Sequence, residues 1–323
     1  MRDGSDRKLS IIVPAMNEEL TLDRAAKILS GIIEQLVSNK KISLDSQILF
    51  IDDGSTDKTW ETIMELSSKR KHVTGIKFSR NFGHQAALIA GFEASKDADL
   101  LVSIDADLQD DPNSIIDMIE KVDSEAVEVV YGVRNDRTTD SFFKRQTASI
   151  FYKIMNELGA KTVKNSADFR LMTKKAMNEF LKFPERDMFI RGLVPLVGFK
   201  SAQVFYKRSP REAGSTKYPL KKMINFAIDG VTSFSIKPIR FLRNMGIAII
   251  FISMIFFAYS FVEHFLGHTT AGWSSLIISI WGLGGLQLFS IGVLGEYIGQ
   301  IFTEVKKRPR YIIEQNLLDQ RQM

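Results

Sequence analysis

The sequence predicts an α/β fold in which a mostly parallel, Rossmann-like sheet is covered by helices on both faces. Three observations predict it. Over residues 1–207, short apolar runs alternate with segments of helical periodicity, which is the pattern of strands joined by crossover helices. Several of these runs end in polar clusters, and ligands of such sheets bind at strand ends. Residues 244–305, by contrast, contain no Lys or Arg, which predicts a separate apolar segment after the sheet.

Five apolar runs of strand length define the predicted sheet. They are Leu9–Val13, Gln47–Ile51, Val73–Phe78, Leu100–Ile104 and Val127–Tyr131. Between the first two runs, apolar residues recur at helical spacing from Ile28 to Leu36, and Asn17 is suited to cap that helix. A second helix is expected to end near Ser68, and a third to run through Glu93. Helices between consecutive strands favour parallel pairing, because a parallel connection must cross back over the sheet.

A basic segment, residues 208–243, follows the predicted α/β domain. Residues 203–243 hold nine Lys and Arg but only two Asp and Glu. Apolar residues recur every three or four positions from Leu220 to Val231, which predicts an amphipathic helix. Next to the apolar segment, this helix is expected to lie in a membrane interface. Packing of the same helix on the α/β domain is the alternative.

Residues 244–305 are expected to form a hairpin of two transmembrane helices with a short external loop. Asn244–Val262 and Leu276–Gly295 carry no charge, and each has the roughly 20 residues that a span requires. A buried helical hairpin in a large soluble core is the alternative. Cationic residues flank the hairpin, which predicts a multi-pass protein of the plasma (inner) membrane with the α/β domain and both termini in the cytoplasm. Residues 306–323 are expected to form a cytoplasmic tail that is loosely ordered after Tyr311.

Composition excludes several kinds of site. The chain of 323 residues has no Cys, which rules out disulfides, Cys-ligated metals and a thiol nucleophile. Its four His are scattered and form no His-x-x-x-His pair, so a His-rich zinc site is not expected. The 43 Lys and Arg slightly outnumber the 38 Asp and Glu. Because the excess gathers beside the apolar segment and not on an element that could read bases, no nucleic-acid partner is expected.

The densest polar cluster follows the fourth predicted strand, at residues 105–111. Four carboxylates fall within seven residues there, and their repulsion at the end of a buried strand is costly unless a cation neutralises it. Asp105 and Asp107 can direct oxygens toward one Mg²⁺ or Mn²⁺, ions that share such ligands with substrate phosphates. Asp110 and Asp111 have another explanation, because acidic residues are also favoured at the start of a helix.

Two other strand ends carry weaker signals. Asp52 and Asp53 follow the second strand, where carboxylates can accept hydrogen bonds from a base or a ribose. A capped turn explains the same residues equally well. Pro14–Glu18 follows the first strand, although Asn-Glu is also ordinary chemistry at a helix start.

The three clusters together resemble the family-2 glycosyltransferases, which have the GT-A fold. The blocks VPAMNEE, IDDGSTD and DADLQDDP occur in that family's order and spacing. The chain is more specifically similar to the polyprenyl-phosphate glycosyltransferases, relatives of bactoprenol glucosyltransferase and dolichyl-phosphate mannose synthase. The segments that carry this similarity are Phe78–Ser95, Ser166–Met172, Arg211–Met223 and the two apolar helices. The resemblance extends from about Leu9 to Ile313 and has one notable departure, Met16, where relatives often have an aromatic residue.

The resemblance implies roles for the matching residues. Those expected to bind the nucleotide-sugar, or the acceptor phosphate in the case of the cations, are Pro14, Glu18, Asp52, Asp53, Asp105, Ala106, Arg134, Arg145, Arg211 and Lys217. Asp105, Asp107 and Gln109 are expected to hold the metal. Asp168 is expected to act as the base for the acceptor, with Asp107 as the second catalytic residue. The alternatives are a buried Asp168 that only pairs with Arg170, and cations that are solvated surface charges.

The resemblance implies an inverting, metal-dependent hexose transfer from a nucleotide-sugar to a polyprenyl phosphate at the cytoplasmic membrane face. Glucose is the favoured sugar and Mg²⁺ or Mn²⁺ the expected cofactor, and the oligomeric state, including a homo-oligomer, stays open. One alternative is a processive polysaccharide synthase of the same fold, but the chain lacks the Gln-x-x-Arg-Trp motif of those enzymes. Another is a membrane-anchored binding protein with an inactive transferase domain, against which Asp105, Asp107 and Asp168 argue.

Overall fold

The computed structural model describes residues 4–135, 166–185, 189–207, 237–265 and 272–320. The chain divides into two compact units. The first contains a sheet, the helices that cover it, and the chain from Arg308 onward. The second contains two long helices, α9 (Lys237–Phe265) and α10 (Trp273–Lys306).

The sheet of the first unit is mixed, with strand order β7-β5-β6-β4-β1-β2-β3-β8. The strands are β1 (Leu9–Ala15), β2 (Gln47–Asp52), β3 (Val73–Phe78), β4 (Leu100–Ser103), β5 (Val129–Arg134), β6 (Ser166–Thr173), β7 (Ser201–Tyr206) and β8 (Ile313–Asn316). Strand β1 pairs in parallel with β2 and β4, and β2 with β3. Strand β6 runs antiparallel to β4 and β5, and β8 runs antiparallel to β3. All five predicted strands form, and the sheet is less uniformly parallel than predicted.

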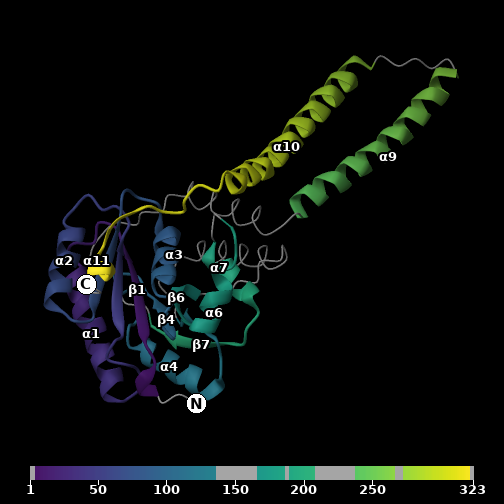
Figure 1. The fold of residues 1–323 in the computed structure, drawn as a ribbon. Coiled ribbons are helices and arrows are strands. Elements are labelled where there is room, and N and C mark those ends of the chain that lie inside the picture. Colours follow the sequence, from purple (N-terminus) through teal and green to yellow (C-terminus); the bar gives the residue numbers. More distant parts are fainter. Residues whose placement is uncertain (1–3, 136–165, 186–188, 208–236, 266–271, 321–323) are drawn as a thin grey trace. The chain divides into compact units, whose positions relative to one another are not determined.

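Helices cover both faces of this sheet (Figure 1). They are α1 (Leu22–Ser38), α2 (Thr59–Lys69), α3 (His84–Ala94), α4 (Ser114–Glu125), α6 (Lys174–Phe180), α7 (Ile190–Leu193) and α11 (Leu317–Gln320), with short 3₁₀ turns η1 (Gly4–Asp6) and η2 (Val194–Val197). Alternate residues of β1 serve the two faces, as the pleat requires. Ile11 and Val13 join the core beneath α1, α2 and α4, whereas Ile12 lies against Gly91 of α3.

The start of α1 differs from the prediction. Its N-cap is Thr21, not Asn17. Asn17 instead has a left-handed backbone with φ of 55°, and its Oδ1 accepts a hydrogen bond from the N–H of Thr56 at 2.9 Å. The Asn17 amide therefore ties the loop after β1 to the loop after β2, a contact that local sequence could not reveal.

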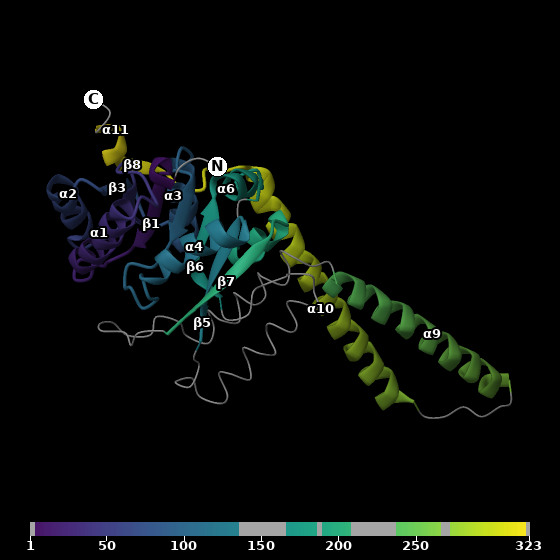
Figure 2. The same ribbon diagram turned by 90° about the horizontal axis from the view of Figure 1, so that it is seen from below.

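The tail after Tyr311 is also more ordered than predicted. Ile313–Asn316 forms β8 on the edge of β3, and α11 packs on the same strand (Figure 2). The Tyr311 ring stacks on Phe78 with a centroid separation of 5.0 Å. Trp60 donates from Nε1 to Oε1 of Gln315 at 2.9 Å. A polar sequence forms a strand here because backbone pairing with β3, which does not depend on apolar side chains, holds it at the edge of the sheet.

The prediction of a transmembrane hairpin is wrong. Helices do form, and α9 contacts α10. Within the stretches that the structure describes, however, no helix combines the length and the apolar character that crossing a bilayer requires. The predicted multi-pass location in the plasma membrane, with its cytoplasmic orientation, is wrong for the same reason.

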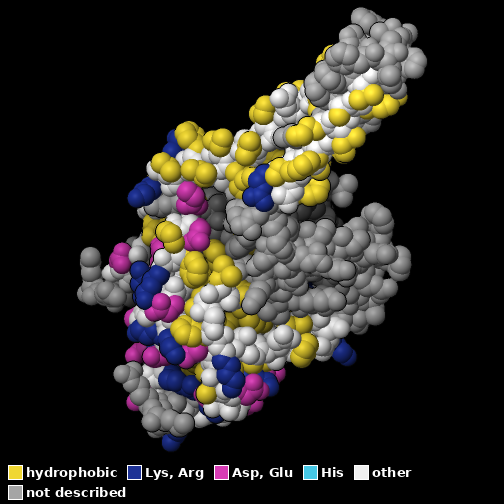
Figure 3. Space-filling model, turned by 90° about the vertical axis from the view of Figure 1, so that its right-hand side faces the viewer, with side chains coloured by type: hydrophobic (Ala, Val, Ile, Leu, Met, Phe, Trp, Pro, Cys, Tyr) yellow, Lys and Arg dark blue, Asp and Glu magenta, His cyan; other side chains and the backbone are white. Residues whose placement is uncertain are grey.

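The second unit nevertheless exposes large apolar side chains. Phe251 of α9 is 63% exposed and Leu288 of α10 is 72% exposed, and hydrophobic side chains gather along both helices (Figure 3). The predicted amphipathic helix over Leu220–Val231 lies outside the described residues.

Candidate active site

Three neighbouring parallel strands bring the predicted acidic residues to one edge of the sheet. Strand β1 lies between β2 and β4, and all three run in the same direction. Asp52 ends β2, and Asp53 follows it. Asp105 comes two residues after the end of β4. The carboxyl ends of these strands therefore present Asp52, Asp53 and Asp105 on the same side of the sheet, which is where ligands bind in open α/β sheets.

Asp53 is held by the backbone that leads from β3 into α3. Its Oδ1 accepts from the N–H of Phe82 at 2.7 Å, and its Oδ2 accepts from the N–H of Gly83 at 2.9 Å. Burial raises the pKa of Asp53, and these two N–H donors offset only part of that rise. Gly54 makes this contact feasible, because its φ is 69° and a Cβ there would lie 2.3 Å from the backbone carbon of Arg80.

Asp52 is fully buried yet only half satisfied. Its Oδ1 accepts from the N–H of Ser55 at 3.0 Å. Its Oδ2 has no hydrogen-bond partner among the described residues. Burial accordingly raises the pKa of Asp52. A buried acceptor without a donor is costly, so this oxygen is suited to receive an N–H or O–H from a ligand.

The loop after β1 presents less to a ligand than predicted. Pro14 is buried within β1 opposite Ile51. The Glu18 carboxylate accepts from the Thr21 hydroxyl at 3.0 Å, and its N–H donates to Thr59 Oγ1 at 2.9 Å. These contacts give Glu18 a role in shaping the loop, and nucleoside contact by Pro14 and Glu18 stays a prediction.

The loop after β4 is a tight turn that crowds carboxylates together. The N–H of Leu108 donates to the Asp105 carbonyl at 3.2 Å, and the N–H of Gln109 donates to Asp107 Oδ1 at 3.2 Å. Leu108 has a left-handed φ of 45°, a conformation that costs an L-residue about 1–2 kcal/mol. Ala106 and Gln109 are buried in this turn, whereas Asp105 and Asp107 are partly exposed.

Asp105 carries the clearest electrostatic signal of the site. Loss of water around the carboxyl is the main cause that raises the pKa of Asp105 to about 6, and the nearby charges of Asp168, Asp110 and Asp107 contribute to that rise. His84 acts in the opposite direction. Although 42% of the Asp105 side chain is reached by solvent, its carboxyl group lies among acidic neighbours that disfavour a second negative charge.

Asp168 comes to the same place on the reversed strand β6. Ser103 of β4 lies opposite Arg170, so the antiparallel register continues to bring Asp168 beside Asp105. Arg170 donates from Nη2 to Asp168 Oδ1 at 2.7 Å. Arg191 of α7 donates from Nε to Oδ1 at 3.0 Å and from Nη2 to Oδ2 at 2.9 Å. Burial alone would raise the pKa of Asp168, but Arg191, His84 and Arg170 hold it well below its usual value.

Two residues of this network were missed from the sequence. His84 Nε2 lies 3.4 Å from Asp168 Oδ2 and 3.7 Å from Asp105 Oδ1. Burial would lower the pKa of His84, but the two carboxylates outweigh it and the pKa is raised. His84 belongs to a segment that resembles the family, so its position at a helix start could have identified it. Arg191 carries no local signal, because it lies in a four-residue helix.

Of the four predicted cationic site residues, the described part of the chain includes Arg134. Arg134, at the end of β5, pairs with the buried Asp110, with its Nη2 3.0 Å from Oδ1. It therefore neutralises one of the four clustered carboxylates and is not a solvated surface charge. Arg145, Arg211 and Lys217 lie outside the described residues.

The donor set fits a divalent ion that is shared with a ligand. Nowhere in the described ranges do three or more His, Asp or Glu side chains form a group that could hold a metal on its own. Asp105 and Asp107 supply two carboxylates, and Mg²⁺ commonly binds one or two carboxylates together with substrate phosphates. Repulsion from neighbouring carboxylates contributes to the raised pKa of Asp105, and a divalent cation bound here would offset that repulsion.

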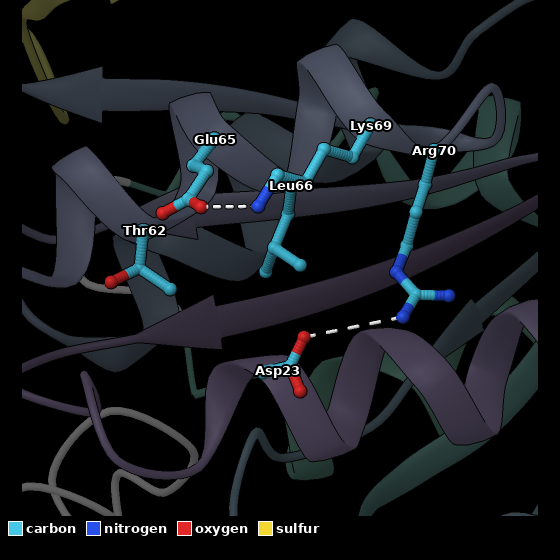
Figure 4. Close-up of a pocket in the computed structure, with 6 residues that line it drawn as sticks. All are labelled: Asp23, Thr62, Glu65, Leu66, Lys69 and Arg70. Carbon is cyan, nitrogen blue, oxygen red and sulfur yellow. Dashed lines mark hydrogen bonds and ion pairs between the residues drawn. The ribbon is translucent and has the colours of Figure 1, made fainter.

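A surface pocket between α1 and α2 holds none of the predicted site residues (Figure 4). It is lined by Asp23, Thr62, Glu65, Leu66, Lys69 and Arg70. Its charges are paired, Lys69 with Glu65 and Arg70 with Asp23. Paired charges on exposed helices contribute little and indicate no chemistry, so the candidate site is the strand edge.

The chain matches known proteins over nearly its whole length. The model of glycosyl transferase family 2 matches residues 10–181. YkoT of Bacillus subtilis, an uncharacterized glycosyltransferase, is 52% identical over 313 residues, which cover 97% of this chain and 93% of that protein. A prophage bactoprenol glucosyl transferase homolog of Escherichia coli is 39% identical over 309 residues, which cover 95% and 98%. Bactoprenol glucosyl transferase of Shigella phage SfII is 38% identical over 311 residues, which cover 96% and 98%.

One solved structure illustrates the more distant similarity. Glucosyl-3-phosphoglycerate synthase from Mycobacterium tuberculosis, crystallised with Mn²⁺, uridine diphosphate and phosphoglyceric acid, has a TM-score of 0.45 and 18% identity, covering 70% of this chain and 76% of that chain. A likeness this weak says nothing about the ligands of the present protein. The family match over more than half of the chain, together with relatives at 38–52% identity along almost all of it, shows that this protein is a glycosyltransferase and belongs to glycosyltransferase family 2.

Proposed function

We propose that this protein transfers a hexose, with glucose favoured, from a nucleotide-sugar to the phosphate of a polyprenyl lipid, with inversion at the anomeric carbon. The observation that carries the proposal is the shared edge of β2, β1 and β4, where Asp52, Asp53 and Asp105 lie at or just after the carboxyl ends of β2 and β4. Relatives named bactoprenol glucosyl transferases support the class of acceptor and sugar.

The carboxylates after β2 are suited to a nucleoside. The unpartnered Oδ2 of Asp52 is a buried acceptor for a base N–H or a ribose hydroxyl. Asp53 holds the backbone at Phe82 and Gly83, so its part is to keep the neighbouring loop in place. Donor recognition thus divides between a binding carboxylate and a carboxylate that shapes the loop.

Asp105 and Asp107 would hold Mg²⁺ or Mn²⁺ together with the donor diphosphate, with Gln109 nearby in the same turn. When bound, such an ion supplies positive charge to the departing nucleoside diphosphate. Arg134 is not assigned to the stabilisation of the departing diphosphate, because it already pairs with Asp110.

The transfer itself needs positioning more than proton removal. An oxygen of the lipid phosphate attacks the anomeric carbon, the bond from that carbon to the diphosphate oxygen breaks, and the electron pair leaves with the nucleoside diphosphate. A phosphate monoester is largely ionised at neutral pH. Asp168 has a strongly lowered pKa and two arginine partners. Its proposed role is therefore to orient Arg191 and the acceptor.

The test is transfer by the purified full-length protein with radiolabelled nucleotide-sugars and detergent-dispersed polyprenyl phosphate. A charged lipid product from UDP-glucose supports the proposal, whereas a long polymer or no product from any donor overturns it. Asp107→Ala is expected to lower turnover at least about 100-fold, because it removes charge stabilisation of the leaving group. Asp117→Ala, which alters an exposed carboxylate of α4, is the matched control and should keep normal turnover. Turnover of Asp107→Ala near that of Asp117→Ala, also after EDTA treatment, would remove Asp107 from the site.

A further inference from the structure

The start of α3 contacts four separate parts of the candidate site: the loop after β2, the loop after β4, strand β6 and helix α7. Gly83, His84 and Gln85 are consecutive, and Gly83 is the N-cap of the helix. The N–H of Gly83 donates to both carboxylate oxygens of Asp53, at 3.2 and 2.9 Å. The first of these residues is thereby tied to the loop after β2, on the donor side of the site.

His84 reaches the other two strands. Its Nε2 lies 3.7 Å from Asp105 Oδ1, after β4, and 3.4 Å from Asp168 Oδ2, on β6. The side chain is 39% exposed, so it is not an apolar core residue. An imidazole nitrogen between two carboxylates of different strands attracts both, and so it holds close together two groups that would otherwise repel one another.

Gln85 completes the arrangement from the other side of Asp168. Its Oε1 accepts from the N–H of Ile190 at 3.3 Å. The next residue, Arg191, makes the two-point contact with the Asp168 carboxylate. The position of α7, and therefore of the Arg191 guanidinium that pairs with Asp168, thus depends on the same first turn of α3.

Helix α3 is itself firmly seated. Its residues from Ala87 to Phe92 are buried. At Gly91 a Cβ would lie 2.3 Å from Cγ2 of Ile12, so the helix backbone packs directly on β1. Because α3 is packed in this way, residues Gly83–Gln85 at its N-terminus have little freedom to move, and their contacts keep fixed separations.

We propose that the Gly83–Gln85 turn is a positioning device for the acceptor side of the site, with His84 as the positioning residue that fixes Asp168 relative to Asp105. The inference rests on the proposed hexosyl transfer and adds a residue to it. His84 acts through the two carboxylates, so its loss changes their separation and leaves nucleotide contacts largely in place.

The experiment compares His84→Ala and His84→Gln in the full-length protein. We expect His84→Ala to lower kcat about 100-fold, the cost of a misplacement near 1 Å, with the KM for UDP-glucose changed less than about threefold. UDP binding in the presence of Mn²⁺, measured by calorimetry, and Tm should stay near wild type. His84→Gln keeps an N–H at similar reach and should recover at least about tenfold of kcat.

His72 provides the matched control. It lies before β3, and its Nδ1 contacts the Ser46 carbonyl at 2.8 Å, away from the carboxylates of the site. His72→Ala should lower Tm and leave kcat unchanged. Equal kcat for wild type and His84→Ala overturns the inference. It is also overturned if UDP affinity falls by as large a factor as kcat, or if Tm falls so far that unfolding explains the lower kcat.

A double variant tests whether His84 acts through Asp168. If it does, the double variant His84→Ala, Asp168→Asn has the kcat of Asp168→Asn alone. The reason is that Asp168→Asn already removes the contact through which His84 acts, so His84→Ala has nothing further to remove. Losses that multiply overturn the inference. The absence of any product from the wild-type protein overturns the proposed function instead, and so separates the two failures.

Discussion

At the scale of single residues, Gly54 decides whether the loops after β2 and β3 can meet. Its left-handed φ and its approach to the backbone at Arg80 leave no room for a side chain. Asp53, the preceding residue, then reaches the N–H groups of Phe82 and Gly83. The sequence block IDDGSTD predicts a turn at this glycine, but the close approach of the second loop is a tertiary fact.

We expect Gly54→Ala to lower both stability and donor affinity. The positive φ alone costs about 1–2 kcal/mol for a residue with a Cβ, and the backbone contact adds to it. Chemical denaturation and UDP calorimetry measure the two effects. Gly31→Ala is the control, since a Cβ at Gly31 in α1 meets nothing within 4 Å. It should stabilise the protein by about 0.5–1 kcal/mol. Unchanged UDP affinity in Gly54→Ala would contradict the proposed link between the two loops.

At the scale of elements, β8 ties the chain end to the strand that precedes the donor loop. The N–H of Ser79 donates to the Ile312 carbonyl at 3.0 Å, directly after β3 ends. Tyr311 stacks on Phe78, and Phe82 meets Phe78 edge to face at a centroid separation of 5.8 Å. The Tyr311 hydroxyl donates to Glu93 of α3. The end of the chain thus supports the loop that holds Asp53.

Variants of Tyr311 separate these contacts. Tyr311→Ala should lower the free energy of unfolding by about 2–4 kcal/mol, because it empties the space over Phe78. Tyr311→Phe keeps the stacked ring and loses only the hydroxyl contact with Glu93, worth about 1–2 kcal/mol. Tyr259→Ala, which alters a tyrosine of α9 that is 63% exposed, should be close to neutral. Equal effects of the Ala and Phe changes at Tyr311 would show that the ring contact contributes nothing.

At the scale of the whole molecule, buried carboxylates give the stability of the fold two opposite dependences on pH. The pKa of Asp168 is lowered in the folded protein, so its arginine pairs stabilise the fold above the unfolded pKa and this contribution is lost as pH falls. The pKa of Asp53 is raised by burial, so ionisation of Asp53 lowers the stability of the fold, and this cost grows as pH rises from the unfolded pKa to the folded pKa.

Denaturation of wild type, Asp168→Asn and Asp53→Asn across the acid range tests both signs. The stability advantage of wild type over Asp168→Asn should be full above about pH 4 and shrink below it, since about 4 is the unfolded pKa of Asp. The advantage over Asp53→Asn should instead shrink as pH rises above about 4. A difference that is constant with pH for either variant would contradict the corresponding pKa shift.

The extent of prediction from sequence follows the range of the interactions involved. Val73–Phe78 was predicted with the bounds it has, because apolar runs and turn residues are local signals. Strand β6 was predicted only as a motif, since its pairing with β4 and β5 joins distant segments. The tail after Tyr311 was predicted to be loosely ordered because its composition is polar, and edge pairing with β3 overrode that signal.

The sequence by itself determined the alternating α/β pattern, the acidic clusters at strand ends, and the resemblance to family-2 glycosyltransferases. Each depends on residue type and spacing along the chain. Only the tertiary structure decided that Asp168 is gripped by Arg191, that Arg134 neutralises Asp110, and that His84 lies between Asp105 and Asp168. It also overturned the predicted transmembrane hairpin. The physical reason is that charge pairing and burial depend on distances between residues far apart in sequence, which no local pattern encodes.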